Sequence, residues 1–201
     1  MDFDLNLQRE YFNTNIKYGI IKGNSQIVLI KPGQDGSLRG YDDKYIKIAK
    51  ALNLKYNFTV ICSSNPYDFK HNPLEDAIDL IRNYISDNNI ENPYVIYIGN
   101  SIGGMLGARY GYLYPEIKKM LLINIPLLKN CDLILSGLRK FTGDKVSIVY
   151  GSEDASIKYV KFFDNIDNEN IKYHIIDGEN HNFSNNKYDF KKLPDEFLFN
   201  S

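Results

Sequence analysis

Short runs of apolar residues, rich in β-branched side chains, alternate along this chain with longer amphipathic segments. A strand that is apolar at nearly every position is buried on both faces, as in a parallel sheet covered by helices. Helices between such strands give a repeated βαβ pattern with right-handed crossovers. The alternation therefore predicts an α/β protein, a three-layer α/β/α sandwich around a mostly parallel sheet.

The apolar runs and amphipathic segments also give approximate bounds for the elements. The expected strands are 16–23, 26–31, 57–64, 94–99, 121–126, 145–151 and 171–178. The expected helices are 41–53, 73–89, 101–120, 155–166 and 191–200, and the third is expected to break near Pro115. We expect the first 25 residues to supply one or two edge strands.

The chain has 201 residues, which is enough for one domain with a well-buried core, and we predict a single domain over 1–201. Segment 127–144 fits the alternation poorly, because it lies between two expected strands and is compatible with a helix. In sheets of this kind, material at this place often overhangs the carboxyl edge, where ligands bind. We therefore predict a small cap segment there.

The charge pattern gives no electrostatic footprint for nucleic acid or for an anionic membrane surface. The formal net charge is -1, and no block of Lys and Arg stands out. No apolar stretch approaches the roughly 20 residues that cross a bilayer, and the N-terminus lacks the pattern of a secretory signal. Cys62 and Cys131 form no disulfide framework, which favours reduced thiols. We expect a cytoplasmic protein with no membrane span and no nucleic-acid partner.

The strand-like sequence YVIYIG leads directly into NSIGG. A parallel strand delivers its last residue to the carboxyl edge of the sheet, where the next helix begins with unpaired N–H groups. Gly99 and Gly103 would avoid Cβ collisions in a very tight turn, while Ser101 holds a strained backbone. The hydroxyl of Ser101 would then project as a nucleophile, with the N–H of Ile102 directed at the oxyanion. The alternative is a glycine-rich turn that binds phosphate or nothing.

This G-x-S-x-G elbow, from Gly99 to Gly103, lies before a helix with small residues along one side, at 104, 107, 108 and 111. From about Gln26 to its C-terminus, the chain resembles a small member of the α/β-hydrolase superfamily, an esterase-like serine hydrolase with a minimal cap. The superfamily uses a serine, an acid and a histidine in that chain order. The acid follows a later strand, and the histidine follows the last strand.

The resemblance implies that Ser101 is the nucleophile. It also implies that His181, in the loop after the last expected strand, is the general base and acid. His71 precedes the serine in the chain, and His174 lies inside an expected strand, where a structural role is natural. The alternative for His181 is a solvent-exposed loop histidine without a catalytic role.

The resemblance places the acid shortly after a strand-ending glycine, and Asp154 occupies that position after the expected strand 145–151. This carboxylate would orient the imidazole of His181. Glu153 is a close competitor. Asp177 is another, although it lies near His181 in the sequence and would need a different loop geometry.

A second oxyanion donor is expected in the loop after the strand 26–31, where relatives often carry His-Gly. This chain has Pro32-Gly33-Gln34 there, so the match is in position and glycine content only. Aligning Gly33 with the family glycine makes the backbone N–H of Gln34 the donor, whereas a one-residue shift would give that role to Gly33. Pro32 has no N–H and cannot serve.

Together these residues predict a serine hydrolase that cleaves a carboxylic ester or thioester of a small-molecule acyl substrate through a Ser-His-Asp triad and an acyl-enzyme intermediate. No cofactor or metal is expected, because the sequence has no Cys/His cluster with ligand spacing and no glycine-rich nucleotide motif. Three alternatives stay open: a peptidase or acyltransferase with the same triad, a non-catalytic ligand-binding module, and a flavodoxin-type domain that holds phosphate. The sequence leaves the oligomeric state undetermined.

Overall fold

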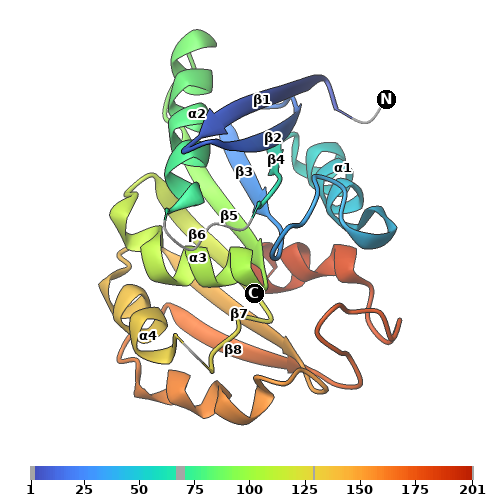
Figure 1. Cartoon of the computed structure of the whole chain (residues 1–201), viewed down its shortest axis with the longest axis vertical. Helices are drawn as coiled ribbons and strands as arrows, with labels where there is room; N and C mark the ends of the chain where they lie inside the picture. The colour runs from blue at the N-terminus through green and yellow to red at the C-terminus, as the bar shows by residue number, and fades with distance from the viewer. Residues whose placement is uncertain (1–2, 67–70, 129, 201) are drawn as a thin grey trace.

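The computed structural model describes residues 3–66, 71–128 and 130–200. In these ranges eight strands form one sheet in the order β1-β2-β4-β3-β5-β6-β7-β8 (Figure 1). The strands are β1 (Leu5–Tyr11), β2 (Thr14–Ile21), β3 (Gln26–Lys31), β4 (Thr59–Ser63), β5 (Tyr94–Asn100), β6 (Ile117–Ile123), β7 (Lys145–Gly151) and β8 (Ile171–Ile176). The α-helices are α1 (Lys44–Tyr56), α2 (Pro73–Asp87), α3 (Ile102–Tyr110) and α4 (Cys131–Lys140). Shorter helices are the 3-10 helices η1 (Tyr41–Asp43), η2 (Gly111–Leu113), η3 (Ile157–Asn165) and η4 (Phe190–Lys192), and the π-helix η5 (Asp195–Phe199).

Most neighbouring strands of the sheet run in the same direction. β3 pairs in parallel with β4 on one side and with β5 on the other, and β6, β7 and β8 continue the parallel order. β1 and β2 form an antiparallel hairpin at the edge and pair with β4. The predicted mostly parallel sheet and the predicted N-terminal edge strands are therefore confirmed. Because parallel strands end at one edge, the loops after β3, β5, β7 and β8 meet there.

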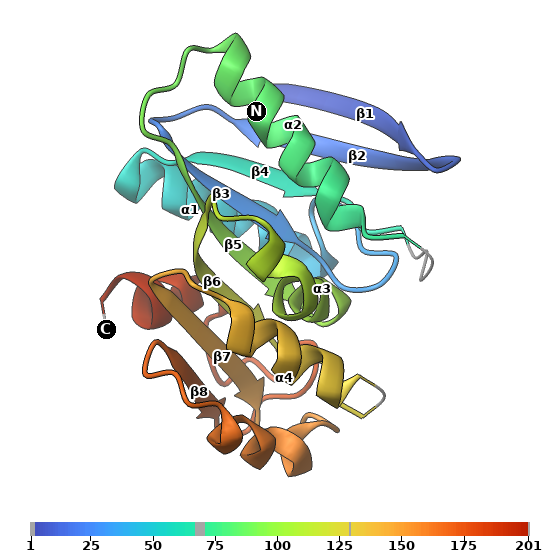
Figure 2. The same ribbon diagram turned by 90° about the vertical axis from the view of Figure 1, so that its left-hand side faces the viewer.

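The central strand β5 shows why a continuous apolar run forms the middle layer of a sandwich. Its side chains alternate, with Val95 and Tyr97 in one core cluster and Ile96 and Ile98 in the other. Helices α2, α3 and α4 cover the first face, and α1 and the C-terminal segment cover the second (Figure 2). Fully burying such a Val or Ile stabilises the fold by about 1.5–3 kcal/mol. The predicted three-layer sandwich is confirmed.

The helix predicted at 101–120 is wrong in its second half. α3 ends at Tyr110, a 3-10 turn follows, and β6 begins at Ile117, four residues before the predicted start of that strand. Glycine and proline at Gly111 and Pro115 stop the helix. The first residues of β6 include two half-buried lysines, whose polarity hid the strand in the sequence pattern. Pairing with β5 and β7 extends the strand over them.

The predicted helices at the two ends of the chain also differ from the observed ones. α1 begins at Lys44 rather than at 41, because Asp42 and Asp43 adopt left-handed backbone angles and form the 3-10 helix η1. The segment 155–166 holds the 3-10 helix η3, and 191–200 is divided between η4 and η5. Within the described ranges, none of the helices combines the length and the apolar character needed to cross a membrane.

The segment 127–144, predicted to be a small cap, contains helix α4, and its residue 129 lies outside the described residues. The apolar face of α4, which includes Ile134 and Leu138, is buried. At Gly137 the helix lies so close to α3 that an added Cβ would meet the carbonyl oxygen of Ala108 at 2.2 Å. α4 therefore belongs to the layer that covers the sheet. A role for the rest of this segment in covering a bound substrate stays a prediction.

Candidate active site

Ser101 lies in a strained turn between β5 and α3, at the carboxyl edge of the sheet. Its backbone angles are φ 52° and ψ -117°, outside the regions that a serine prefers. Such a conformation costs on the order of 1–3 kcal/mol and persists only where the surroundings enforce it. Two hydrogen bonds do so: the N–H of Ser101 donates to the carbonyl of Ile123 on β6 at 2.7 Å, and its carbonyl accepts from the N–H of Met105 at 2.9 Å.

The glycines on either side of Ser101 make this turn sterically possible. A Cβ added at Gly99 would lie 2.6 Å from the backbone of Gly103, and one added at Gly103 would lie 2.2 Å from the carbonyl oxygen of Lys31. Real Cβ atoms essentially never come so close to backbone atoms. The first turn of α3 thus packs directly on the ends of β5 and β3, which is the collision that the sequence pattern predicted glycine would avoid.

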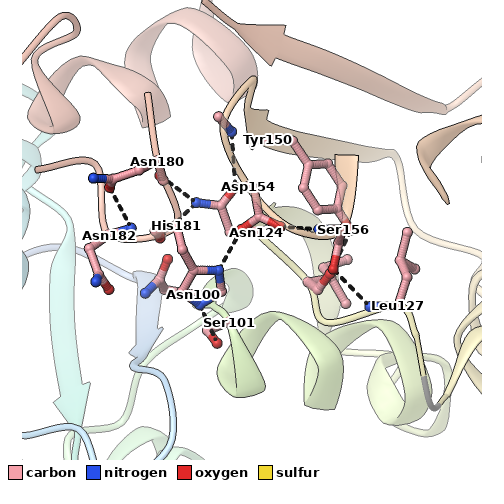
Figure 3. A network of polar contacts seen from close by, with 12 residues as sticks. Asn100, Ser101, Asn124, Leu127, Tyr150, Asp154, Ser156, Asn180, His181 and Asn182 are labelled. Carbon is pink, nitrogen blue, oxygen red and sulfur yellow. Dashed lines mark hydrogen bonds and ion pairs between the residues drawn. The ribbon is translucent and has the colours of Figure 1, made fainter. Parts of the chain in front are cut away.

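The structure brings together the three side chains that the sequence singled out (Figure 3). The Oγ of Ser101 lies 2.9 Å from Nε2 of His181, and Nδ1 of His181 lies 2.5 Å from Oδ2 of Asp154. Because an ionised carboxylate only accepts, the imidazole proton belongs on Nδ1, and Nε2 is left to accept from the serine hydroxyl. The side chain of His181 is 43% exposed and that of Asp154 is 1% exposed, so the contacts run from a buried carboxylate to a solvent-accessible imidazole.

Asp154 is buried in the turn after β7 and its carboxylate is engaged on both oxygens. Oδ1 accepts from the backbone N–H of Ser156 at 2.6 Å, while Oδ2 faces His181. The two competing carboxylates lie elsewhere. Glu153 is exposed and accepts from the side-chain amide of Asn185, and Asp177 is exposed beside the hydroxyl of Ser152. Of the three candidate acids, the structure therefore brings Asp154 to the histidine.

The other two histidines lie away from Ser101. His71 stacks on Phe12 at a ring distance of 3.8 Å, beside the β1–β2 turn. His174 lies within β8, with its ring 4.6 Å from that of Phe197, and burial together with nearby lysines lowers its pKa. His174 thus has the structural role that the sequence indicated.

The loop after β3 passes directly against the serine. A Cβ added at Gly33 would lie 3.2 Å from Cβ of Ser101, a tight contact that would need a small shift of one of the two segments. Ile102 is the first residue of α3 and its N–H belongs to the positive end of the helix. Among the residues that the structure describes, no partner takes the backbone N–H of Ile102 or of Gln34. The two predicted oxyanion donors are therefore available.

Sequence reasoning missed Asn124, which follows β6 and holds the histidine loop. This side chain is fully buried, and its backbone φ is 48°. Its Nδ2 donates to the carbonyl of His181 at 2.8 Å, and its Oδ1 accepts from the N–H of Gly151 at 3.0 Å (Figure 3). Asn124 thus joins the loop that carries His181 to the strand that precedes Asp154. A single asparagine inside the apolar run LLINIP was the signal that could have revealed it.

A second residue that sequence reasoning missed is Glu179, which is fully buried within the histidine loop. Its Oε1 accepts from the backbone N–H groups of Lys187 and Tyr188 at 2.7 and 2.8 Å, and its Oε2 accepts from that of Asn185 at 3.3 Å. A buried carboxylate that accepts three backbone hydrogen bonds fixes the course of the loop around His181. No nearby motif in the sequence marks it.

Two surface cavities are lined by residues of the loops that carry His181 and that follow β3. One, of about 510 Å³, is lined by Asn182, next to His181, and by Lys44 at the start of α1. Burial lowers the pKa of Lys44 to about 8. The other, of about 430 Å³, is lined by Asp35 and neighbouring residues of the loop that follows β3. Neither cavity is lined by Ser101 or His181. Across the described ranges, no three His, Cys, Asp or Glu side chains come together as a group that could hold a metal ion.

Comparisons with known proteins find similarity in structure only. No protein-family model matches the chain, and a search of curated proteins finds no match. Among solved structures, an alpha-beta serine hydrolase homologue from Coxiella burnetii has a TM-score of 0.68 at 15% identity, with 90% of each chain covered. An esterase domain from a Rhodothermus marinus protein has a TM-score of 0.66 at 14% identity, again with 90% of each chain covered. A thioesterase domain from the curacin biosynthetic pathway has a TM-score of 0.62 at 11% identity, and the match covers 89% of this chain and 94% of that domain. At such identities the likeness shows the fold alone.

Proposed function

We propose that this chain, which has the α/β-hydrolase fold, is a serine hydrolase that cleaves a carboxylic ester or thioester through Ser101, His181 and Asp154. The observation that carries the proposal is the continuous path of contacts from Ser101 Oγ through the imidazole to a buried carboxylate, with both distances in hydrogen-bonding range. A serine hydroxyl is a weak nucleophile without such a base. An esterase domain and a thioesterase domain share the fold, which supports this class of reaction.

In the first half of the reaction, Ser101 attacks the acyl carbonyl while His181 Nε2 accepts the hydroxyl proton. Asp154 keeps the imidazole in its productive tautomer and stabilises the imidazolium. The negative charge that develops on the carbonyl oxygen is received by the backbone N–H groups of Ile102 and Gln34, which need no reorganisation because the elbow and its loop already hold them. Collapse of the tetrahedral species expels the alcohol or thiol, which takes the proton from His181.

In the second half, water enters on the exposed side of His181 and gives up a proton to Nε2 as it attacks the acyl-enzyme. The oxyanion is received in the same place, and the proton returns to Ser101 as the acid product leaves. No step requires a group other than these residues and water.

Activity-based labelling tests the proposal. A fluorophosphonate probe is expected to modify Ser101, and short-chain p-nitrophenyl esters or acyl thioesters are expected to be turned over. Ser101→Ala should lose both labelling and turnover while unfolding at the same denaturant concentration. Ser86→Ala, on the exposed side of α2, is the matched control and should keep both. Full labelling or full turnover in Ser101→Ala would overturn the assignment.

A further inference from the structure

The loop after β3, residues 32–36, lies against the nucleophile and has little in its own sequence to make it rigid. It contains Gly33 and Gly36, and the side chains between them, Gln34 and Asp35, are exposed. Backbone donors stabilise an oxyanion best when they are already held in place before the reaction begins. A loop that supplies such a donor therefore needs an anchor elsewhere in the chain.

The end of β4 and the residues after it hold both ends of this loop. Lys31, the last residue of β3, is fully buried, and its Nζ donates to Oγ of Ser63 at 2.8 Å and to the carbonyl of Ser64 at 3.1 Å. These bonds tie the start of the loop to the end of β4. At the other end of the loop, Gly36 forms an isolated antiparallel bridge with Asn65.

Asn65 binds the loop through its own backbone and through its side chain. Its carbonyl accepts from the N–H of Asp35 at 2.9 Å, and its N–H donates to the carbonyl of Gly36 at 3.0 Å. The residue is 2% exposed. Its Nδ2 donates to the carbonyl of Pro32 at 3.0 Å and, over a longer 3.4 Å, to that of Gly33. A single buried residue thus contacts most of the backbone of the loop.

The two side-chain bonds have a geometric consequence for the N–H groups of the loop. In a planar trans peptide, the C=O and the N–H point in opposite directions. Holding the carbonyls of Pro32 and Gly33 therefore also fixes the directions of the next two N–H groups, those of Gly33 and Gln34. The carbonyl of Gly33 is held a second time, because the N–H of Gly36 donates to it at 3.1 Å.

The peptide groups that Asn65 holds are in contact with the elbow. A Cβ added at Gly33 would lie 3.2 Å from Cβ and 3.7 Å from Oγ of Ser101. A Cβ added at Gly103, in the first turn of α3, would lie 2.5 Å from the carbonyl oxygen of Pro32. A shift of these peptide groups therefore changes the position of their N–H groups relative to the nucleophile.

We propose that Asn65 is a positioning residue for the oxyanion. Its side-chain amide holds the carbonyls of Pro32 and Gly33 and thereby keeps the N–H groups of the loop in place for the negative charge formed at Ser101. The inference rests on the proposed function and adds to it a residue outside the triad and the elbow. Asn65 acts through the loop rather than on the substrate.

Asn65→Ala is the direct test, because it removes both side-chain bonds and keeps the backbone groups that pair with Asp35 and Gly36. Loss of a complete oxyanion donor costs about 10²–10³ in kcat, and misplacing one by about 1 Å costs up to about 10². We expect kcat to fall about 10- to 100-fold, with KM and the pH profile unchanged, because the His181–Asp154 pair is untouched. The affinity for a trifluoromethyl ketone that mimics the tetrahedral species should fall in parallel with kcat/KM.

Asn65→Leu separates hydrogen bonding from packing. Leucine has nearly the volume of asparagine and fills the same space, but it has no donor for the two carbonyls. We expect its kcat to fall about as far as that of Asn65→Ala. A native kcat in Asn65→Leu would show that Asn65 only fills space, and a native kcat in Asn65→Ala would equally overturn the proposal.

Asn53→Ala is the matched control for general destabilisation. The side chain of Asn53, near the end of α1, also donates to two backbone carbonyls, those of Lys22 at 2.8 Å and Phe58 at 2.9 Å. Phe58 directly precedes β4, so this contact lies at the edge of the sheet opposite to Ser101. The variant should lose stability and keep kcat. An equal loss of kcat in Asn53→Ala and Asn65→Ala would contradict the proposal.

Amide hydrogen exchange tests the anchor without any enzyme activity. The amides of Asp35 and Gly36 should be protected in the native protein, because each donates to a backbone carbonyl. The amide of Gly36 should exchange faster in Asn65→Ala, since the carbonyl to which it donates is then held less firmly. An unchanged exchange rate at Gly36 overturns the inference whatever the activity, whereas turnover that survives Ser101→Ala overturns the proposed function.

Discussion

The elbow at Ser101 and the loop that carries His181 hold atoms 2.9 Å apart by different physical means. The elbow is held by close packing: its glycines lie against backbone atoms of the neighbouring strand and helix, and nothing larger fits. The histidine loop is held by buried polar side chains, Asn124 and Glu179, which bind its backbone through hydrogen bonds. Substitutions should therefore disrupt the elbow through steric overlap, whereas substitutions in and around the histidine loop should disrupt it through lost hydrogen bonds.

The largest effect is expected at the elbow, from Gly103→Ala. The new methyl group would meet the carbonyl of Lys31, which cannot move without shifting β3. We expect the free energy of unfolding to fall by about 3 kcal/mol, the upper part of the range for overpacking, and labelling of Ser101 to be lost. Denaturant unfolding and fluorophosphonate labelling measure the two effects.

Gly104→Ala, one residue further along α3, is the control for Gly103→Ala. Its new methyl group would lie no closer than 3.2 Å to a neighbour, and alanine favours the helix. This variant should unfold at nearly the native denaturant concentration. Equal destabilisation by the two alanines would contradict the steric account of the elbow.

An intermediate effect is expected at Asn124, where two substitutions separate hydrogen bonding from backbone strain. Asn124→Ala loses the bonds to His181 and Gly151 and places a Cβ-bearing residue without a polar side chain at φ 48°. We expect a loss of about 2–3 kcal/mol in stability for alanine and about 1–2 kcal/mol for Asn124→Gly, which tolerates this angle. Both should lower kcat, because the backbone of His181 loses its anchor.

A native kcat in both Asn124 variants would contradict the claim that hydrogen bonds from Asn124 hold the histidine loop. The histidine loop would then keep its geometry without the hydrogen bonds from β6. Thermal or denaturant unfolding measures the stability of the two variants, and steady-state kinetics on one activated ester measures their kcat.

The smallest effect is expected for Glu179→Gln. One carboxylate oxygen becomes an NH₂ group, which faces a backbone N–H instead of accepting from it. We expect a loss of about 1–2 kcal/mol in stability and faster exchange of the amide of Asn185, because the remaining oxygen keeps the two shorter bonds from Lys187 and Tyr188. Glu153→Gln, on an exposed neighbour, should change stability by less than about 0.5 kcal/mol. Similar losses of stability in both variants would show that the buried hydrogen bonds of Glu179 contribute nothing to stability.

The sequence predicted the sheet well where strands are apolar throughout, and poorly where a strand begins with charged residues. Strands 26–31 and 145–151 have the predicted bounds, because an unbroken apolar run marks a strand buried on both faces. The sequence pattern places the start of β6 in a helix, because its second and third residues are lysines and only pairing with β5 and β7 makes them a strand. Local pattern cannot reveal pairing partners that lie tens of residues away.

The candidate site divides in the same way. Ser101 could be found from five consecutive residues, because the tight turn imposes glycine at fixed positions. The sequence left Asp154 in competition with Glu153 and Asp177, and it left the loop donor undecided between Gly33 and Gln34. Those alternatives differ only in where each group points once the loops are folded.

What the sequence determined by itself is the order of strands and helices along the chain, apart from the boundaries noted above, and the serine elbow, since these depend on alternation and sterics among near neighbours. The tertiary structure decided which carboxylate meets His181 and how Asn124 and Glu179 hold the loop around it. The contacts of Asp154 and Asn124 join residues 27 to 57 positions apart. Hydrogen bonds of that kind leave no periodic trace in a sequence, because each needs only one polar residue whose partner is chosen by the fold.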